Sequence, residues 1–160
     1  MRPIVGVIGG GQLARMMIPR AVELGFDLRV LAETEGMSAS LAATKVGDYT
    51  DTATVLEFAR DVDVITFDHE HVPQDVLAAL VDAGVSVHPG PAPLAVAQDK
   101  ILMRQELTRL GLPVPVWASV SNAAELETFL ADNGGRVIVK TPRGGYDGKG
   151  VRIAVSYTHL

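Results

Sequence analysis

The chain has 160 residues, of which 48% are hydrophobic and 21% are charged, and its formal net charge is −5. This composition is typical of a soluble globular protein, and its mild acidity argues against nucleic acid or an anionic membrane as a partner. The absence of cysteine excludes disulfides, cysteine nucleophiles and thiolate metal sites, and it fits the reducing cytoplasm, where we expect the protein to act. The apolar runs all fall short of the roughly 20 residues of a membrane span.

The chain opens with a pattern that predicts a strand, a glycine turn and a helix. The apolar run Ile4–Ile8 indicates a buried strand, and three glycines at 9–11 follow it as a turn. Apolar residues then recur at helical spacing over 13–24, where a glycine ends the helix. A second strand is predicted over 27–31, and it ends near Glu33.

These first residues match a dinucleotide-binding fingerprint. Gly9, Gly11 and Ala14 have the spacing of its glycine turn, and Glu33 lies about 20 residues on, where such sites hold a ribose. A nicotinamide-dependent oxidoreductase is therefore one hypothesis for the function. The fingerprint alone does not select the ligand, because any anion is stabilised at a helix N-terminus.

Further alternating strands and helices follow, so the sequence predicts an α/β fold with a parallel sheet. A segment rich in proline and glycine at 89–93 then indicates a domain boundary, which places the first domain over 1–91. The predicted elements in between are a short helix over 38–43, a short strand over 45–47, a helix over 52–60, a strand over 63–67, a helix over 73–83 with Pro73 as its first residue, and a strand over 85–88.

The segment His69-Glu70-His71 follows a predicted strand and allows two interpretations. Two histidines at this spacing suit zinc, but no third ligand follows at a familiar spacing, so we predict no metal site. Loops at the carboxyl ends of parallel strands line the ligand crevice of such sheets. Glu70 and the glycine turn would then open onto one crevice, whereas a solvated loop acid is the alternative.

The second half of the chain predicts helix, strand, helix, strand, loop and strand. Asp99 is expected to cap a helix over 100–110, and Asn122 with Glu125 to cap a helix that runs to about 131. Strands are predicted over 116–120, 137–140 and 151–155, of which 137–140 is expected to be buried.

Lys140 stands at the end of this predicted buried strand, before a loop with four glycines in the next ten residues. An unpaired ammonium is costly to bury, and bare N–H groups of a glycine loop can cradle phosphate oxygens. Arg143 and Lys149 add positive charge. We therefore predict a phosphate site, with a plain hairpin tip as the alternative. The loop matches neither the Walker pattern nor the protein-kinase pattern.

The strand-lysine followed by Gly-Gly-Tyr-Asp-Gly-Lys-Gly over 144–150 resembles the ATP-grasp superfamily and, within it, the 5-(carboxyamino)imidazole ribonucleotide synthase family. Gly10-Gly11-Gln12-Leu13 and the Asp99-Lys100 helix start are similar to motifs of the same family. The family often has glycine at the place of Ala14, where alanine still allows close helix–strand packing. The resemblance implies a Rossmann-like parallel-sheet pre-ATP-grasp domain over 1–91, the truncated start of an ATP-grasp domain over 92–155, and an unassigned tail over 156–160.

The resemblance also implies site residues. ATP would be bound by Lys100, Lys140, Gly145, Tyr146, Asp147, Gly148, Lys149 and Gly150, and the ribonucleotide by Gly10, Gly11, Gln12, Leu13 and Glu70. The catalytic residues and the ligands of Mg²⁺ would lie downstream of this chain, which we interpret as an incomplete fragment that has no ligase activity alone.

The implied reaction is the MgATP-dependent carboxylation of 5-aminoimidazole ribonucleotide with bicarbonate through carboxyphosphate, in de novo purine biosynthesis. The full-length enzyme is expected to be a homodimer whose partners are these small molecules. Alternatives are a formate-dependent glycinamide ribonucleotide transformylase or a glycinamide ligase, an NAD-binding oxidoreductase domain, and a non-catalytic nucleotide-binding module.

Overall fold

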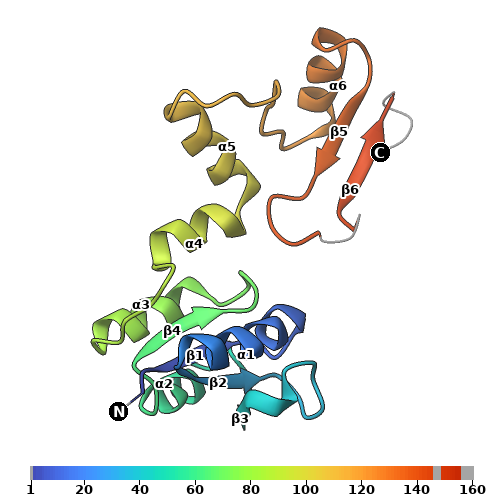
Figure 1. Cartoon of the computed structure of the whole chain (residues 1–160). Coiled ribbons are helices and arrows are strands. Elements are labelled where there is room, and N and C mark those ends of the chain that lie inside the picture. Colours follow the sequence, from blue (N-terminus) through green and yellow to red (C-terminus); the bar gives the residue numbers. More distant parts are fainter. Residues whose placement is uncertain (1, 146–148, 156–160) are drawn as a thin grey trace. The chain divides into compact units, whose positions relative to one another are not determined.

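The structure is a computed structural model that describes residues 2–145 and 149–155. The chain divides into two compact units, Met1–Ala95 and Val96–Leu160 (Figure 1). The first unit contains β1 (Ile4–Ile8), α1 (Gln12–Leu24), β2 (Asp27–Ala32), the 3₁₀ turn η1 (Ser40–Ala42), β3 (Ala43–Val46), α2 (Thr52–Ala59), β4 (Val64–Phe67) and α3 (Gln74–Asp82). Helix α4 (Pro91–Gln98) follows, and then α5 (Lys100–Arg109), α6 (Ala123–Asp132), β5 (Val137–Lys140) and β6 (Val151–Ala154).

The first unit is built on a four-stranded parallel sheet with the order β3-β2-β1-β4. Strand β1 pairs in parallel with β2 and with β4, so the carboxyl ends of these three strands lie at one edge. Since parallel strands with covered faces are buried on both sides, their sequences are near-continuous apolar runs, as in Ile4–Ile8. The predicted Rossmann-like α/β fold is confirmed.

Neighbouring residues of the strands pack on opposite faces of this sheet. One core contains Ile8, Leu31 and Ile65 with side chains from α2 and α3. The other contains Val7 and Val30 with Ala14 of α1 and with Ala39. The period of two along each strand places the helices on two faces, which leaves the strand ends and their loops for ligand contacts.

The helix boundaries follow local capping chemistry. Gly25 ends α1 in the left-handed conformation with φ of 77°, as predicted. The Asp51 side chain accepts hydrogen bonds from two N–H groups at the start of α2. Pro73 has an extended ψ of 147° and precedes α3 as its cap, so the prediction that Pro73 is the first helical residue is wrong.

The strand predicted over 85–88 also differs from the structure. Residues 85–88 form a single bridge, Ile65 with Val87, instead of a strand. The N–H of His88 donates to Ile65, but Pro89 has no N–H with which to continue the ladder. Helix α4, which the sequence analysis did not predict, begins at Pro91 within the segment 89–93, where a proline is compatible with a helix start.

The second unit holds a two-stranded antiparallel sheet against one helix. Strands β5 and β6 pair from Val137 with Ala154 to Lys140 with Val151. Val137 and Val139 pack with Leu126 and Leu130 of α6. The other face of β5 is exposed, as the 62% exposure of Ile138 shows, so the prediction of a buried strand is wrong within the described residues.

Helix caps in this unit are as predicted, whereas one strand is not. Asn122 accepts a hydrogen bond from the N–H of Glu125, whose carboxylate accepts one from the N–H of Ser121. This is a reciprocal cap at the start of α6. Residues 116–120 form no strand, because none of the described strands pairs with them.

Candidate functional site

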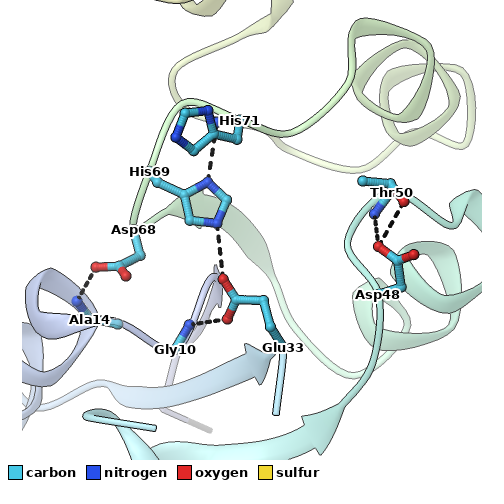
Figure 2. Close-up of polar contacts among 8 residues, drawn as sticks. All are labelled: Gly10, Ala14, Glu33, Asp48, Thr50, Asp68, His69 and His71. Carbon is cyan, nitrogen blue, oxygen red and sulfur yellow. Dashed lines mark hydrogen bonds and ion pairs between the residues drawn. The ribbon is translucent and has the colours of Figure 1, made fainter. Parts of the chain in front are cut away.

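Three loops meet at the carboxyl edge of the parallel sheet, and Figure 2 shows their polar contacts. They are the glycine turn at 9–11 after β1, the residue Glu33 after β2, and the segment 68–71 after β4. Because β1 lies between β2 and β4, the glycine turn lies between the other two loops. This is the edge at which open α/β sheets bind their ligands.

Close packing requires glycine at all three positions of the turn. Gly9 has a φ of +104°, which side chains rarely adopt. A Cβ atom added at Gly10 would lie 2.8 Å from the Cβ of Ala32, and one added at Gly11 would lie 2.1 Å from Oδ2 of Asp68. The turn is therefore in direct contact with the strand end and the loop on either side of it.

Asp68 caps helix α1 from a distant part of the sequence. The N–H of Ala14 donates to its Oδ1 at 2.6 Å, whereas Gly11 has no side chain that could cap the helix and the first turn of α1 contains no acid. A carboxylate at a helix N-terminus is stabilised by the helix dipole and by the unpaired N–H groups. The sequence analysis missed Asp68. The position of Asp68 directly after a predicted buried strand is the sequence feature that could have identified it.

Glu33 joins the glycine turn to the 68–71 segment. One carboxylate oxygen accepts a hydrogen bond from the N–H of Gly10 at 3.0 Å, and the other lies 3.2 Å from Nε2 of His69 (Figure 2). In a dinucleotide site the acid at this place binds the ribose. Here both oxygens of Glu33 already have partners within the chain.

His69 has a second contact on its other ring nitrogen. The N–H of His71 donates to Nδ1 of His69 at 3.1 Å, and the ring of Tyr49 lies 4.7 Å from the ring of His69 at a tilted angle. Burial, and then the negative charge of Glu33, raise the pKa of Tyr49. Within the described residues, no three His, Cys, Asp or Glu side chains form a group that could hold a metal ion.

The five residues predicted to bind the ribonucleotide are distributed over this edge. Gly10 is buried and Gly11 half-buried in the glycine turn, Gln12 and Leu13 are exposed in the first turn of α1, and Glu70 is half-buried within the 68–71 segment. The fold thus brings their loops together through the bonds of Asp68 to Ala14 and of His69 to Glu33.

In the second unit, the glycine-rich loop is tied to the start of α5. The Nζ of Lys100 donates to the carbonyl of Gly144 at 2.7 Å, and the N–H of Lys100 donates to the carbonyl of Pro142 at 2.9 Å. The guanidinium of Arg143 donates to Asp99 at 3.1 Å. These three bonds hold residues 142–144 against the helix N-terminus.

Asp99 also caps this helix, since its Oδ1 accepts hydrogen bonds from the N–H groups of Ile101 and Leu102. The bond from Leu102, followed by the bond from Arg143, lowers the pKa of the Asp99 carboxyl. Arg143, which we expected to add charge for a phosphate, is thus paired with a carboxylate of its own chain.

The glycines of the loop allow its two ends to approach each other. Gly145 and Gly150 have φ of +79° and +69°, and Cβ atoms added there would lie 2.6 Å from the Lys149 carbonyl and from Oγ1 of Thr141, respectively. The N–H of Thr141 donates to the carbonyl of Gly150. Tyr146, Asp147 and Gly148, which we expected to bind ATP, lie outside the described residues.

Lys140 and Lys149 are both exposed. The prediction that Lys140 ends a buried strand is therefore wrong in this structure, because helix α6 covers only the face of β5 that carries Val137 and Val139. The cost of burying an ammonium cannot support a phosphate role for Lys140. That role depends on the motif and on the comparisons below.

Two family models match the chain. One, described as the ribonucleotide synthetase preATP-grasp domain, matches residues 1–98, and the other, described as the ATP-grasp domain, matches residues 105–160. The chain belongs to the ribonucleotide synthetase pre-ATP-grasp family. The resemblance stated from the glycine motifs is confirmed, and the comparisons favour it over the nicotinamide-dependent hypothesis.

Curated members of this family are similar over both units. The N5-carboxyaminoimidazole ribonucleotide synthase of Corynebacterium ammoniagenes is 48% identical over 151 residues, which are 93% of this chain and 37% of the relative. The enzyme of the same name from Mycobacterium tuberculosis strain H37Rv is 46% identical over 154 residues, which are 95% of this chain and 36% of the relative. The chain thus spans less than two fifths of the length of these relatives.

Solved structures of the family have the same fold. An N5-carboxyaminoimidazole ribonucleotide synthetase in complex with ADP superposes with a TM-score of 0.87 at 30% identity, over 98% of this chain and 42% of that one. The Staphylococcus aureus synthetase with ADP has a TM-score of 0.88 at 28% identity, over 98% of this chain and 43% of that one. None of the helices formed by the described residues combines the length and the apolar character needed to cross a bilayer.

Proposed function

We propose that this chain is the N-terminal part of an ATP-dependent 5-(carboxyamino)imidazole ribonucleotide synthase. In this reaction MgATP phosphorylates bicarbonate, and the exocyclic amine of 5-aminoimidazole ribonucleotide captures the carboxyphosphate or the carbon dioxide that it releases. The observation that carries the proposal is the 48% identity to a relative of this name, which extends over both units.

The ATP side of the site belongs to the second unit. Phosphoryl transfer needs charge neutralisation and alignment more than covalent chemistry. We propose that Lys100, Lys140 and Lys149 neutralise the charge of the ATP phosphates. We propose that the backbone of the loop 145–150, which includes Tyr146, Asp147 and Gly148, covers these phosphates. The bond of Lys100 to Gly144 supports this assignment, because it already holds one of these ammonium groups against the loop.

The ribonucleotide side belongs to the first unit. We assign it to Gly10, Gly11, Gln12, Leu13 and Glu70. The first turn of a helix offers N–H groups that suit the oxygens of a ligand, and Glu70 supplies an acceptor for hydroxyl or amine donors. The location of these residues at the carboxyl edge of a parallel sheet supports the assignment.

The other residues that the reaction needs are proposed to lie outside this chain. We place the catalytic residues and the Mg²⁺ ligands in the portion that the relatives have beyond it, and we expect a cytoplasmic homodimer at full length. No nucleic acid or membrane partner is part of the proposal. The 160-residue chain alone is expected to have no ligase activity.

The test uses the full-length enzyme and follows ADP release with bicarbonate and 5-aminoimidazole ribonucleotide. We expect Lys140→Ala to raise the KM for MgATP about tenfold, as the loss of one charged hydrogen bond would. Arg136→Ala is the matched control, because it removes an exposed positive charge just before the same strand and should leave this KM unchanged. Wild-type enzyme that releases no ADP with these substrates, or that binds NADH tightly in calorimetry, would overturn the proposal.

A further inference from the structure

Glu33 and His69 form a link that the proposed reaction does not use. They follow β2 and β4, the two neighbours of β1, so the link passes beside the glycine turn that follows β1 (Figure 2). The side chains of His69 and Glu33 are only 18% and 29% exposed. A Cβ atom added at Gly9 would lie 2.9 Å from Cδ2 of His69, so the ring packs directly on the turn.

The hydrogen bonds of His69 define its tautomer. Because Nδ1 accepts the N–H of His71, it carries a lone pair and no hydrogen. In the neutral ring the hydrogen is then on Nε2, which donates to Glu33. The other oxygen of Glu33 accepts the N–H of Gly10. One chain of bonds therefore connects the backbone of the 69–71 segment to the backbone of the glycine turn.

We propose that Glu33 and His69 are positioning residues that hold the glycine turn and the segment carrying Glu70 in one arrangement, and so set the affinity for the ribonucleotide. The inference rests on the proposed function, since the ribonucleotide is the ligand assigned to these two loops. Both oxygens of Glu33 have partners within the chain, so the carboxylate acts through Gly10 and His69.

The first test determines the tautomer of His69. NMR of the 160-residue chain labelled with ¹⁵N-histidine distinguishes ring nitrogens with and without hydrogen, and only four histidines contribute. We expect the neutral ring of His69 to carry its hydrogen on Nε2, with its signals assigned by their loss in His69→Phe. A hydrogen on Nδ1 would overturn the inference.

The kinetic test compares variants of the full-length enzyme. Glu33→Gln has one acceptor oxygen for two donors, so it loses either the bond from Gly10 or the bond from His69. We expect Glu33→Gln and His69→Phe to raise the KM for the ribonucleotide about tenfold and to leave kcat and the KM for MgATP within about twofold of wild type. His69→Gln, whose amide can still donate to Glu33, should recover part of this loss.

His88→Gln is the matched control. The ring of His88 is exposed and contacts Ser86, so His88→Gln should leave the KM for the ribonucleotide unchanged. The positioning role would be overturned if both KM values and kcat worsened equally in the variants, or if Glu33→Gln left the KM for the ribonucleotide unchanged. In either case, turnover by the wild-type enzyme would still support the proposed function. Wild-type enzyme without turnover contradicts the proposed function itself, before any variant is compared.

Discussion

Replacing Gly11 with alanine should destabilise the first unit through one identified contact. Gly11 has a φ of −78°, which alanine adopts without strain, so the backbone itself allows the change. The added Cβ atom, however, would lie 2.1 Å from Oδ2 and 3.1 Å from Cγ of Asp68. The carboxyl group has to move away, and the hydrogen bond from Ala14 to Asp68 is lost with it.

The magnitude follows from the bond that is lost. A hydrogen bond to a charged group contributes about 2 kcal/mol to stability, so Gly11→Ala should lower the free energy of unfolding by about this amount. Asp68→Ala removes the same bond and should cost about the same. The double variant should cost little more than either single one, because the three nearest atoms that the added methyl group meets all belong to the Asp68 carboxyl group.

The assay is urea unfolding of the 160-residue chain, followed by circular dichroism. Gly90→Ala is the control, because a Cβ atom added at Gly90 meets nothing within 4 Å, and its effect should stay within about 1 kcal/mol. If the effects of Gly11→Ala and Asp68→Ala simply add in the double variant, the two residues do not act through one contact and the reasoning is wrong.

Two further predictions concern the second unit, whose unfolding the fluorescence of Trp117, the single tryptophan, reports. Asp99→Asn keeps a capping side chain and removes the charge that pairs with Arg143, so it should cost about 0.5 kcal/mol at pH 7 after solvent screening. In the folded chain the pKa of Asp99 lies below its ordinary 3.8, so this contribution to stability is present above pH 3.8 and should vanish as the pH falls through the folded pKa. A stability difference between wild type and Asp99→Asn that persists at lower pH would contradict this. Gly150→Ala should destabilise the unit by about 1–3 kcal/mol more than Gly144→Ala, since both have φ near +70° but only the Cβ atom at 150 meets Thr141; equal costs would show that backbone conformation alone matters there.

Features that depend on neighbouring residues in the sequence were predictable. The run Ile4–Ile8, the end of α1 at Gly25 and the caps Asp99 and Asn122 all appear in the structure where the sequence places them. In each case, backbone N–H and C=O groups must be satisfied within a few residues, or an apolar run must be buried. The local sequence pattern is therefore sufficient to predict these features.

Features that depend on a distant partner were not predictable. Residues 116–120 have the composition of a strand, but none of the described strands pairs with them. Lys140 ends a strand that the described part of the chain covers on one face only. The bond between Asp68 and Ala14 joins residues 54 positions apart, and that between His69 and Glu33 joins residues 36 apart. Only the parallel order of β2, β1 and β4 brings these side chains together.

The dinucleotide fingerprint illustrates why spacing alone does not identify a ligand. Its glycines are required here because the turn contacts Ala32 on one side and Asp68 and His69 on the other, which is true whatever ligand is bound. In a dinucleotide site the acid after β2 binds a ribose, whereas Glu33 accepts hydrogen bonds from Gly10 and His69. The glycine spacing and this acid are therefore explained by contacts within the chain, and the family comparison, not the glycine pattern, decides between the hypotheses.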